Sequence, residues 1–248
     1  MKLLFTLLTC SLLLTTQAQS TISKPTPPPV KDTTHTLKSL LDAKKADFEA
    51  KASEEKKKIY AAGINDIIEK GVLKKAKQYK DKAPNFELKN AVGDNVALAD
   101  LLKKGPVILT WYRGGWCPYC NITLNKLQQN LKEFKSLGAT LVALTPEIPD
   151  KSLDTKEKHQ LEFEVLSDID NKVAREYGIV FKLTPDVAKA YQAAFNLHEY
   201  NKSESDELPL AATFVIDKNG TIRYAFVKAD YRERAEPADI IEVLKGLQ

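Results

Sequence analysis

The sequence predicts an α/β fold in which helices cover both faces of a central sheet, preceded by a helical extension. Residues 106–112 (PVILTWY) form a nearly continuous apolar run, which is typical of a strand buried on both faces. Beyond it, segments with strand character alternate with segments of helical periodicity. A hairpin signal at 218–220 (KNG) and an apolar helical stripe after Pro237 end the chain.

Composition indicates an ordinary globular chain of 248 residues, with 43% apolar and 28% charged residues. These values exclude wholesale disorder, a collagen-like chain and an architecture made only of coiled coils. Three cysteines are too few for a disulfide-stapled miniature scaffold. The net charge of +4 is too small to indicate a nucleic-acid partner, and none is expected.

The first 18 residues have the pattern of a secretory signal peptide. Lys2 precedes an apolar run from Leu3 to Leu14, and small residues lead to an expected cleavage after Ala18. The run is too short to span a bilayer comfortably, so we expect a secreted or periplasmic protein without stable membrane insertion. A lipoprotein with Cys10 as the lipidated residue is the less favoured alternative, because Thr9 is a poor residue before such a cysteine.

Residues 19–35 form a linker rich in Pro, Ser and Thr, and residues 36–80 are predicted to be helical. Thr36 is a plausible N-cap for a first helix, and Gly71 interrupts a second helical segment. The apolar positions that define the two helices are Leu37, Leu41 and Phe48, then Tyr60, Ile64, Ile67, Ile68 and Val72. Residues 31–82 carry a net charge of +5, which indicates a solvated lysine face or, alternatively, a docking arm for an acidic partner or an anionic membrane.

From residue 83 onward the chain alternates strands and helices. Gly138 is expected to end the helix whose apolar stripe is Leu124, Leu127, Leu131 and Phe134. Before this helix the sequence predicts a hairpin at 86–98, a short helix at 100–102 and a strand at 106–112. After it come a strand at 139–144, a helix at 150–160, a strand at 163–166 and helices at 173–177 and 185–196. A polar loop, a hairpin at 213–227 and a final helix complete the chain.

The motif with the clearest chemistry is YRGGWCPYC at residues 112–120, where the buried strand ends and a helix begins. A helix N-terminus stabilises a thiolate, because its unpaired amides and dipole favour negative charge. Cys117 and Cys120 are three residues apart, so their sulfurs can close a small disulfide ring. We expect Cys117 to be the more exposed thiol and Cys120 to lie one turn further in.

Neighbouring residues add candidate roles. Arg113 is a permanent positive charge in a flexible Gly114-Gly115 loop, where it can stabilise a thiolate or orient a polar oxidant. The predicted catalytic residues are therefore Cys117, Cys120 and Arg113, and the predicted substrate-binding residues are Tyr112, Gly115 and Trp116. A zinc site is not expected, because four ligands are needed and the three histidines are scattered. An inert disulfide is disfavoured, because so small a loop contributes little stabilisation.

From about Lys82 to Gln248 the chain resembles the peroxiredoxin-like branch of the thioredoxin superfamily, the alkyl hydroperoxide reductase/thiol-specific antioxidant group. The resemblance lies in DKAPNFELKNAVGDNVALADLL, GPVILTWYRGGWCPYC, LPLAATFVIDKNGTIRYAFV and DYRERAEPADIIEVL. It implies a thioredoxin-like domain with a central mixed sheet over residues 82–248. It also implies a thiol peroxidase for hydrogen peroxide or organic hydroperoxides, recycled by a thioredoxin-like dithiol protein, with no metal, haem or nucleotide cofactor.

Two registers of the motif compete within this resemblance. The peroxiredoxin register places Cys120 at the peroxide-attacking position, whereas the thioredoxin register makes Cys117 the attacking thiol; we favour Cys120. The late position that holds Arg in peroxiredoxins and cis-Pro in thioredoxins is Ala211 here, with Pro209 displaced by two residues. Arg113 is then the candidate for the missing charge.

Two other functions stay open at this point. A thiol–disulfide oxidoreductase acting on protein disulfides in an export compartment would use the same pair, with Cys117 attacking. A redox-silent binding protein on the same scaffold is the third possibility, because a fold does not settle function. The sequence leaves open whether the chain forms an oligomer and whether residues 37–80 pack on the domain.

Overall fold

The computed structural model describes residues 35–248. The predicted signal peptide (1–18), Cys10 and all but the last residue of the predicted linker (19–35) lie outside the described residues. Within residues 35–248, no helix is both long enough and apolar enough to cross a membrane.

The N-terminal extension is helical, as predicted. Its helices are α1 (Leu37–Lys51), α2 (Glu54–Glu69) and α3 (Val72–Lys75). Thr36 caps α1, because its side chain accepts a hydrogen bond from the Ser39 amide at 3.1 Å. Gly71 separates α2 from α3 in a left-handed conformation (φ +65°), which explains the interruption expected there.

A five-stranded mixed sheet forms the centre of the domain, in the order β5-β4-β3-β8-β9. Strand β3 pairs in parallel with β4 and antiparallel with β8, while β4–β5 is parallel and β8–β9 antiparallel. The strands are β3 (Val107–Trp111), β4 (Thr140–Thr145), β5 (Glu164–Ser167), β8 (Thr213–Ile216) and β9 (Ile222–Phe226). The mixed sheet and its closing hairpin confirm the prediction.

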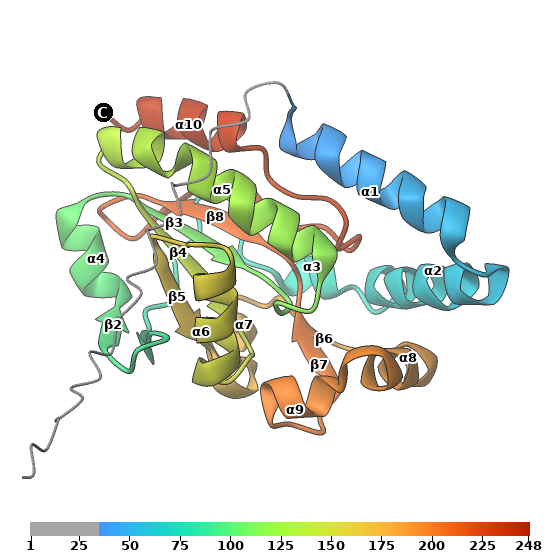
Figure 1. Ribbon diagram of the computed structural model, residues 1–248. Helices are drawn as coiled ribbons and strands as arrows, with labels where there is room; N and C mark the ends of the chain where they lie inside the picture. Colours follow the sequence, from blue (N-terminus) through green and yellow to red (C-terminus); the bar gives the residue numbers. More distant parts are fainter. Residues whose placement is uncertain (1–34) are drawn as a thin grey trace, which may run out of the picture.

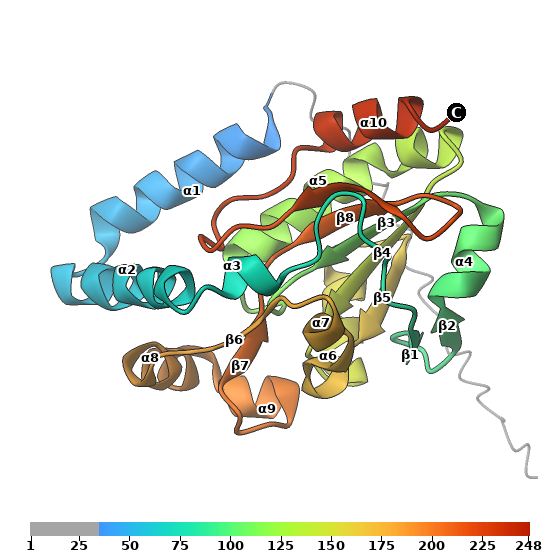
Figure 2. The ribbon, with the colours of Figure 1, turned by 180° about the vertical axis from the view of Figure 1, so that it is seen from behind.

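Helices cover both faces of this sheet (Figures 1 and 2). On one face, α5, α10 and the start of α1 pack against Ile108; on the other, α2, α3, α4 and α7 pack against Val107 and Leu109. This division follows from the two-residue alternation of β3. The remaining helices are α4 (Leu98–Lys104), α5 (Pro118–Ser136), α6 (Pro149–Lys158), α7 (Lys172–Glu176), α8 (Pro185–Phe195), α9 (Leu197–Asn201), α10 (Pro237–Lys245) and the 3₁₀ turn η1 (Ile169–Asn171).

Two small sheets complete the fold, and one was not predicted. Strands β1 (Glu87–Lys89) and β2 (Asn95–Ala97) form the hairpin expected around residue 93. Strands β6 (Val180–Lys182) and β7 (Glu207–Pro209) pair antiparallel, although the second lies at the end of what the sequence predicted as a polar loop. Three-residue strands carry almost no periodic signal, and the hydrogen bonds that define them come from a partner far along the chain.

The extension packs directly on the domain. Leu37 and Leu41 are buried in the same cluster as α5, and Ile67 and Val72 are buried in the cluster on the opposite face of the sheet. The N-terminal amides of α1 are held from the far end of the chain: the Leu37 and Lys38 N–H groups donate to the Glu236 carboxylate at 3.2 and 2.5 Å. The extension therefore lies against both sides of the domain.

Candidate active site

The two cysteines lie at the start of α5, as predicted. Cys117 is the N-cap residue, and its N–H donates to the Gly114 carbonyl at 3.0 Å. Pro118 follows at the first helical position, where a missing N–H costs nothing. Both cysteines are free thiols and both are buried, with 1% and 0% of their surface exposed. Cys117 is the thiol that lines a cavity, in keeping with the expected order of the two cysteines, but aromatic side chains surround the first turn of the helix and leave almost none of its surface exposed.

Two N–H donors converge on the sulfur of Cys120. The backbone N–H of Arg113 lies 3.5 Å from this sulfur, and Nη2 of Arg234 lies 3.4 Å from it. Burial alone would raise the pKa of Cys120. The hydrogen bond from Cys117, the charges of Arg234 and Arg113 and the Arg113 amide outweigh burial and lower the pKa to about 5. The arrangement therefore holds a thiolate at Cys120.

The neighbouring thiol keeps its proton. Burial, the hydrogen bond to Cys120 and the charge of Cys120 raise the pKa of Cys117 well above its ordinary value, although Arg113 and Arg234 act against this shift. Two interacting thiols titrate as a pair, and here the first proton leaves Cys120. The pair is thus a thiolate and a thiol in adjacent positions, which is the starting state for sulfur chemistry.

Arg113 is a buried residue and not a surface charge. Only 1% of its surface is exposed, and its Nη2 donates to the hydroxyl of Tyr191 at 2.5 Å. Its guanidinium carbon lies 4.1 Å from the ring centre of Tyr231 and 5.1 Å from those of Trp116 and Tyr191. The sequence analysis predicted that the Arg113 side chain stabilises a thiolate through its charge. In the structure the hydrogen bond to the Cys120 sulfur comes from the backbone N–H of Arg113.

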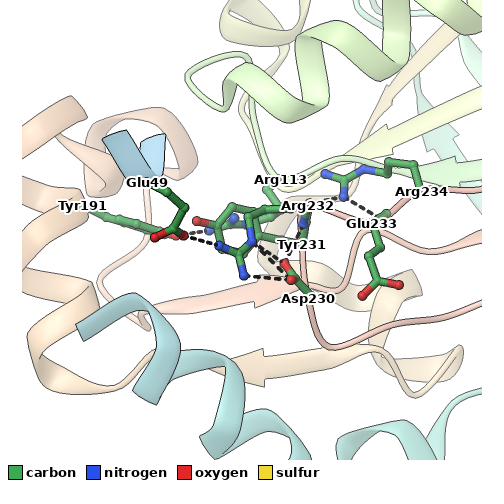
Figure 3. A network of polar contacts seen from close by, with 8 residues as sticks. All are labelled: Glu49, Arg113, Tyr191, Asp230, Tyr231, Arg232, Glu233 and Arg234. Atoms are coloured by element: carbon green, nitrogen blue, oxygen red, sulfur yellow. Dashed lines mark hydrogen bonds and ion pairs between the residues drawn. The ribbon is translucent and has the colours of Figure 1, made fainter. Parts of the chain in front are cut away.

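Arg234 supplies the side-chain donor that sequence reasoning assigned to Arg113. It follows the segment Asp230–Glu233, in which Arg232 pairs with Asp230 at 2.8 Å and lies 3.5 Å from Glu49 of α1 (Figure 3). The other guanidinium nitrogen of Arg234 donates to the carbonyls of Tyr231 and Glu233 and so fixes the side chain. The available signal was the arginine-rich DYRERAEP segment, but nothing in its spacing indicates that it reaches the helix start.

The sequence indicated that position 211, which holds an arginine in peroxiredoxins, supplies no positive charge in this chain, and the structure agrees. Ala211 is buried between β7 and β8, and the displaced Pro209 is the last residue of β7.

Glu147 is a second residue that the sequence analysis missed. It follows β4, is fully buried, and accepts hydrogen bonds from the Gly115 N–H at 2.9 Å and the Thr145 hydroxyl at 3.4 Å. Burial raises its pKa to about 7, with a further contribution from the charge of Cys120 and opposition from these hydrogen bonds. A carboxylate two residues beyond a buried strand was the signal that could have found it.

The predicted substrate-binding residues separate into two groups. Trp116 lines a cavity of about 150 Å³ together with Cys117 and Arg113, whereas Tyr112 and Gly115 do not line it. Tyr112 is buried in the core, and Gly115 holds Glu147 through its amide. The other residues around this cavity are Phe48, Lys56, Tyr60, Pro118, Tyr119, Tyr191, Phe195 and Tyr231.

Comparison with known proteins identifies the family. The sequence profile described as the AhpC/TSA family matches residues 79–225. This chain belongs to the AhpC/TSA family. The peroxiredoxin-like resemblance of the sequence is thereby confirmed.

Relatives of this AhpC/TSA protein carry the name peroxiredoxin. It is 28% identical over 166 residues to peroxiredoxin Q, chloroplastic, of Gentiana triflora, a match that covers 66% of this chain and 64% of the relative. The match to peroxiredoxin Bcp of Bacillus subtilis (strain 168) is 27% identical over 166 residues and covers 67% and 94% of the two chains. The chain therefore spans about 64% of the length of its chloroplastic relative but nearly all of the bacterial one.

Solved structures show the same fold. Peroxidoxin BcpB from Mycobacterium tuberculosis aligns with a TM-score of 0.55 and 21% identity, covering 69% of this chain and 98% of that one. The reduced 2-Cys peroxiredoxin of Plasmodium vivax aligns with a TM-score of 0.54 and 17% identity, covering 68% and 81%. The predicted thioredoxin-like α/β fold is confirmed for this AhpC/TSA protein.

Metal-binding groups are not clustered in the part of the AhpC/TSA protein that the structure describes. Among residues 35–248, no set of three His, Cys, Asp or Glu side chains is placed to hold a metal ion.

Proposed function

We propose that the protein is a thiol peroxidase that reduces hydrogen peroxide and organic hydroperoxides through Cys120 and Cys117. Membership of the AhpC/TSA family and relatives named peroxiredoxin support this class of reaction. The observation that carries the proposal is the convergence of the Arg113 amide and the Arg234 guanidinium on the sulfur of Cys120. Such donors stabilise a thiolate, which is the nucleophilic form of cysteine.

In the first step the Cys120 thiolate attacks one oxygen of the peroxide and the O–O bond breaks. Cys120 becomes a sulfenic acid, and the other oxygen takes up a proton from solvent and leaves as water or an alcohol. Arg234 and the Arg113 amide hold the negative sulfur before attack and remain beside the reacting centre afterwards. Neither group needs to move a proton in this step.

In the second step the Cys117 thiol attacks the sulfenic sulfur. A Cys117–Cys120 disulfide forms, and the sulfenic oxygen leaves as water after taking the proton of Cys117. An external dithiol, for which we propose a thioredoxin-like protein, then reduces the disulfide by thiol–disulfide exchange. Within this protein the proposed cycle uses the two cysteine sulfurs, with electrons from the external dithiol, and calls for no metal, haem or nucleotide.

The test is peroxide consumption by the reduced wild-type protein and the variants Cys117→Ser and Cys120→Ser. We expect wild type to react at about 10⁴ M⁻¹s⁻¹ or faster, a threshold typical of efficient enzymes. Cys120→Ser should abolish the reaction, while Cys117→Ser should react once and accumulate sulfenic acid. A Cys120→Ser variant that consumes peroxide at the wild-type rate would reject the proposed roles.

A thiol–disulfide oxidoreductase is the second candidate, and one observation favours it. Cys117 lines the 150 Å³ cavity and Cys120 does not, so an incoming disulfide meets Cys117 first. This function predicts slow reaction with peroxide together with rapid reduction of insulin disulfides, and loss of that activity in Cys117→Ser. The same three proteins therefore distinguish the two candidates.

We also propose that the protein is exported, on the strength of the signal-like segment 1–18. N-terminal sequencing of protein recovered from an exporting host should begin at Gln19. A lipid-modified product beginning at Cys10 would instead support the lipoprotein alternative.

A further inference from the structure

Two cavities flank the cysteine pair, and they share no lining residue. The first, here called the polar cavity, has a volume of about 410 Å³ and lies between α1 and the segment before α10; Arg234, Arg232, Lys38 and Glu233 are among its lining residues. The second, here called the aromatic cavity, is the 150 Å³ cavity that Cys117 lines. Arg234 therefore connects the polar cavity to Cys120, while the aromatic cavity opens on Cys117.

The aromatic cavity carries positive charge without a carboxylate. Arg113 and Lys56 line it, and no Asp or Glu does. Arg113 is 99% buried, and its Nε and Nη1 have no hydrogen-bond partner among the described residues. A buried charged donor without a partner is costly unless a ligand satisfies it. A carboxylate matches the planar donors of a guanidinium, so an anionic organic molecule is the ligand that fits.

Access and size favour a small molecule. The aromatic cavity shares Phe48, Lys56, Pro118 and Tyr119 with a more open hollow of about 290 Å³, to which Lys44 and Lys51 also contribute. An engineered cavity of about 150 Å³ is known to hold a molecule the size of benzene. The interior space thus takes a few non-hydrogen atoms. Its entrance carries Lys44 and Lys51, which both pair with Asp47, together with Lys56.

We propose that the aromatic cavity is a reductant site, in which a small thiol bearing a carboxylate attacks Cys117 of the oxidised pair. This inference rests on the proposed peroxidase function for its oxidising half. It adds a low-molecular-mass class of reductant to the protein dithiol, and it places the attack of that reductant at Cys117.

The exchange balances as two thiolate attacks. The first thiolate attacks the Cys117 sulfur, forms a mixed disulfide there and releases Cys120 as a thiolate. A second reductant thiolate then attacks the reductant sulfur of the mixed disulfide. The two reductant molecules leave as a symmetric disulfide, and the released Cys117 thiolate takes up a proton. Cys120 is the better leaving group, because the Arg113 amide and Arg234 stabilise its negative charge.

The experiment compares three thiols of similar length on the disulfide form of the full chain: 3-mercaptopropionate (anionic), 2-mercaptoethanol (neutral) and cysteamine (cationic). The disulfide is prepared with diamide, and its reduction is followed by tryptophan fluorescence, since Trp116 lines the cavity. After correction for the thiolate fraction, we expect 3-mercaptopropionate to be at least about tenfold faster than 2-mercaptoethanol, the factor expected for a hydrogen bond to a charged group. Cysteamine should be the slowest. Equal corrected rates for all three thiols would overturn the proposal.

A matched pair of variants tests the location. Lys56→Glu reverses a charge that lines the aromatic cavity, whereas Lys58→Glu makes the same change on the same helix at a position that lines neither cavity. We expect Lys56→Glu to slow 3-mercaptopropionate by about two- to fivefold, as for an exposed charge, and to leave 2-mercaptoethanol nearly unchanged. Lys58→Glu should change neither rate. Equal effects of the two variants would reject the cavity as the site.

Mass spectrometry of the trapped mixed disulfide identifies the attacked sulfur, and a reductant adduct on Cys120 would contradict the proposal. Because diamide supplies the disulfide, this test does not depend on peroxide. If the protein does not consume peroxide but its disulfide is still reduced faster by 3-mercaptopropionate than by the other thiols, only the proposed peroxidase function is rejected. Reduction by thioredoxin but by none of the small thiols would reject the reductant site alone.

Discussion

At Cys120, a single buried sulfur receives one backbone N–H and one guanidinium N–H from parts of the chain more than a hundred residues apart. Arg113 comes from the loop after β3, and Arg234 from the segment before α10. Cys120 is fully buried, so these contacts count for more than they would at the surface. The reactivity we propose for Cys120 depends on this convergence rather than on the cysteine spacing alone.

Replacing Arg234 should therefore weaken the nucleophile. In wild type the peroxide reaction should rise as pH increases through about 5, where Cys120 ionises, and then level off. Arg234→Met removes a charged donor worth about 1.5–3 kcal/mol, so the midpoint should move to higher pH by about one to two units. The rate near pH 5 should then fall by about 10- to 100-fold, while the rate at pH 7 should fall by only about twofold or less. Thiolate absorbance at 240 nm and peroxide kinetics measure the two effects.

Arg223→Met is the control for that change. Arg223 lies on β9 and is paired at 3.6 Å with Asp217, far in the sequence from either cysteine. Its removal should leave the thiolate titration where it is in wild type. An unshifted titration in Arg234→Met would contradict the role given to Arg234.

Glu147 should make stability depend on pH. Its pKa is raised from 4.5 to about 7 by burial, so the folded state binds a proton more tightly than the unfolded state. The stabilisation from the protonated carboxyl is complete below pH 4.5 and is lost as pH rises through 7. Glu147→Gln removes this dependence, and urea unfolding should show wild type losing about 3 kcal/mol relative to the variant between about pH 4.5 and 7.5. A constant difference across that range would contradict this account.

At the scale of elements, two glycines with the same backbone conformation have different neighbours. Gly138 follows α5 at φ +71°, where an added Cβ would have no atom within 4 Å, and Gly178 follows α7 at φ +70°. A Cβ on Gly178 would lie 2.1 Å from the carbonyl oxygen of Lys75, at the end of α3. At Gly178 the backbone of the extension therefore approaches that of the domain too closely for any side chain.

This pair separates backbone strain from steric contact. Gly138→Ala should cost about 1–2 kcal/mol, the penalty for an L-residue in the left-handed region. Gly178→Ala should cost more, because the backbone of residues 75 and 76 must also move. Thermal unfolding of the two variants measures the difference in stability. Equal losses of stability would mean that the end of α3 moves away from residue 178 at no cost.

At the scale of the whole molecule, the extension is part of both hydrophobic layers. Leu41 packs in the cluster of α5, and Ile67 in the cluster across the sheet. Phe48, Lys56 and Tyr60 also line the cavity at Cys117. The extension therefore contributes to stability and to the surroundings of the cysteine pair.

Leu41→Ala tests whether the extension unfolds together with the domain. Removing this buried side chain should lower the free energy of unfolding by about 2–5 kcal/mol. We expect a single cooperative transition, with tryptophan fluorescence and circular dichroism giving the same midpoint. An early separate transition of the helical signal would show instead that the extension unfolds independently.

Features that depend on neighbours along the chain could be predicted from the amino-acid order. The nearly continuous apolar run 106–112 predicted a buried strand, and the periodicity of α5 predicted its inward face. The motif also placed Cys117 and Cys120 at the start of that helix. Thr36 as a cap and Gly138 as a helix end were likewise predictable, because caps and turns are local chemistry.

Which distant groups meet the sulfurs became known only from the packing of the folded chain. Arg234 reaches Cys120, Glu147 holds the Gly115 amide, and Tyr60 of the extension lines the cavity of Cys117. The sequence predicted that Arg113 lies near the cysteines, but it did not predict the aromatic rings around the guanidinium. Those rings come from α8 and from the segment before α10. Contacts of this kind arise when separate elements pack together, and packing geometry leaves no periodic trace in the sequence.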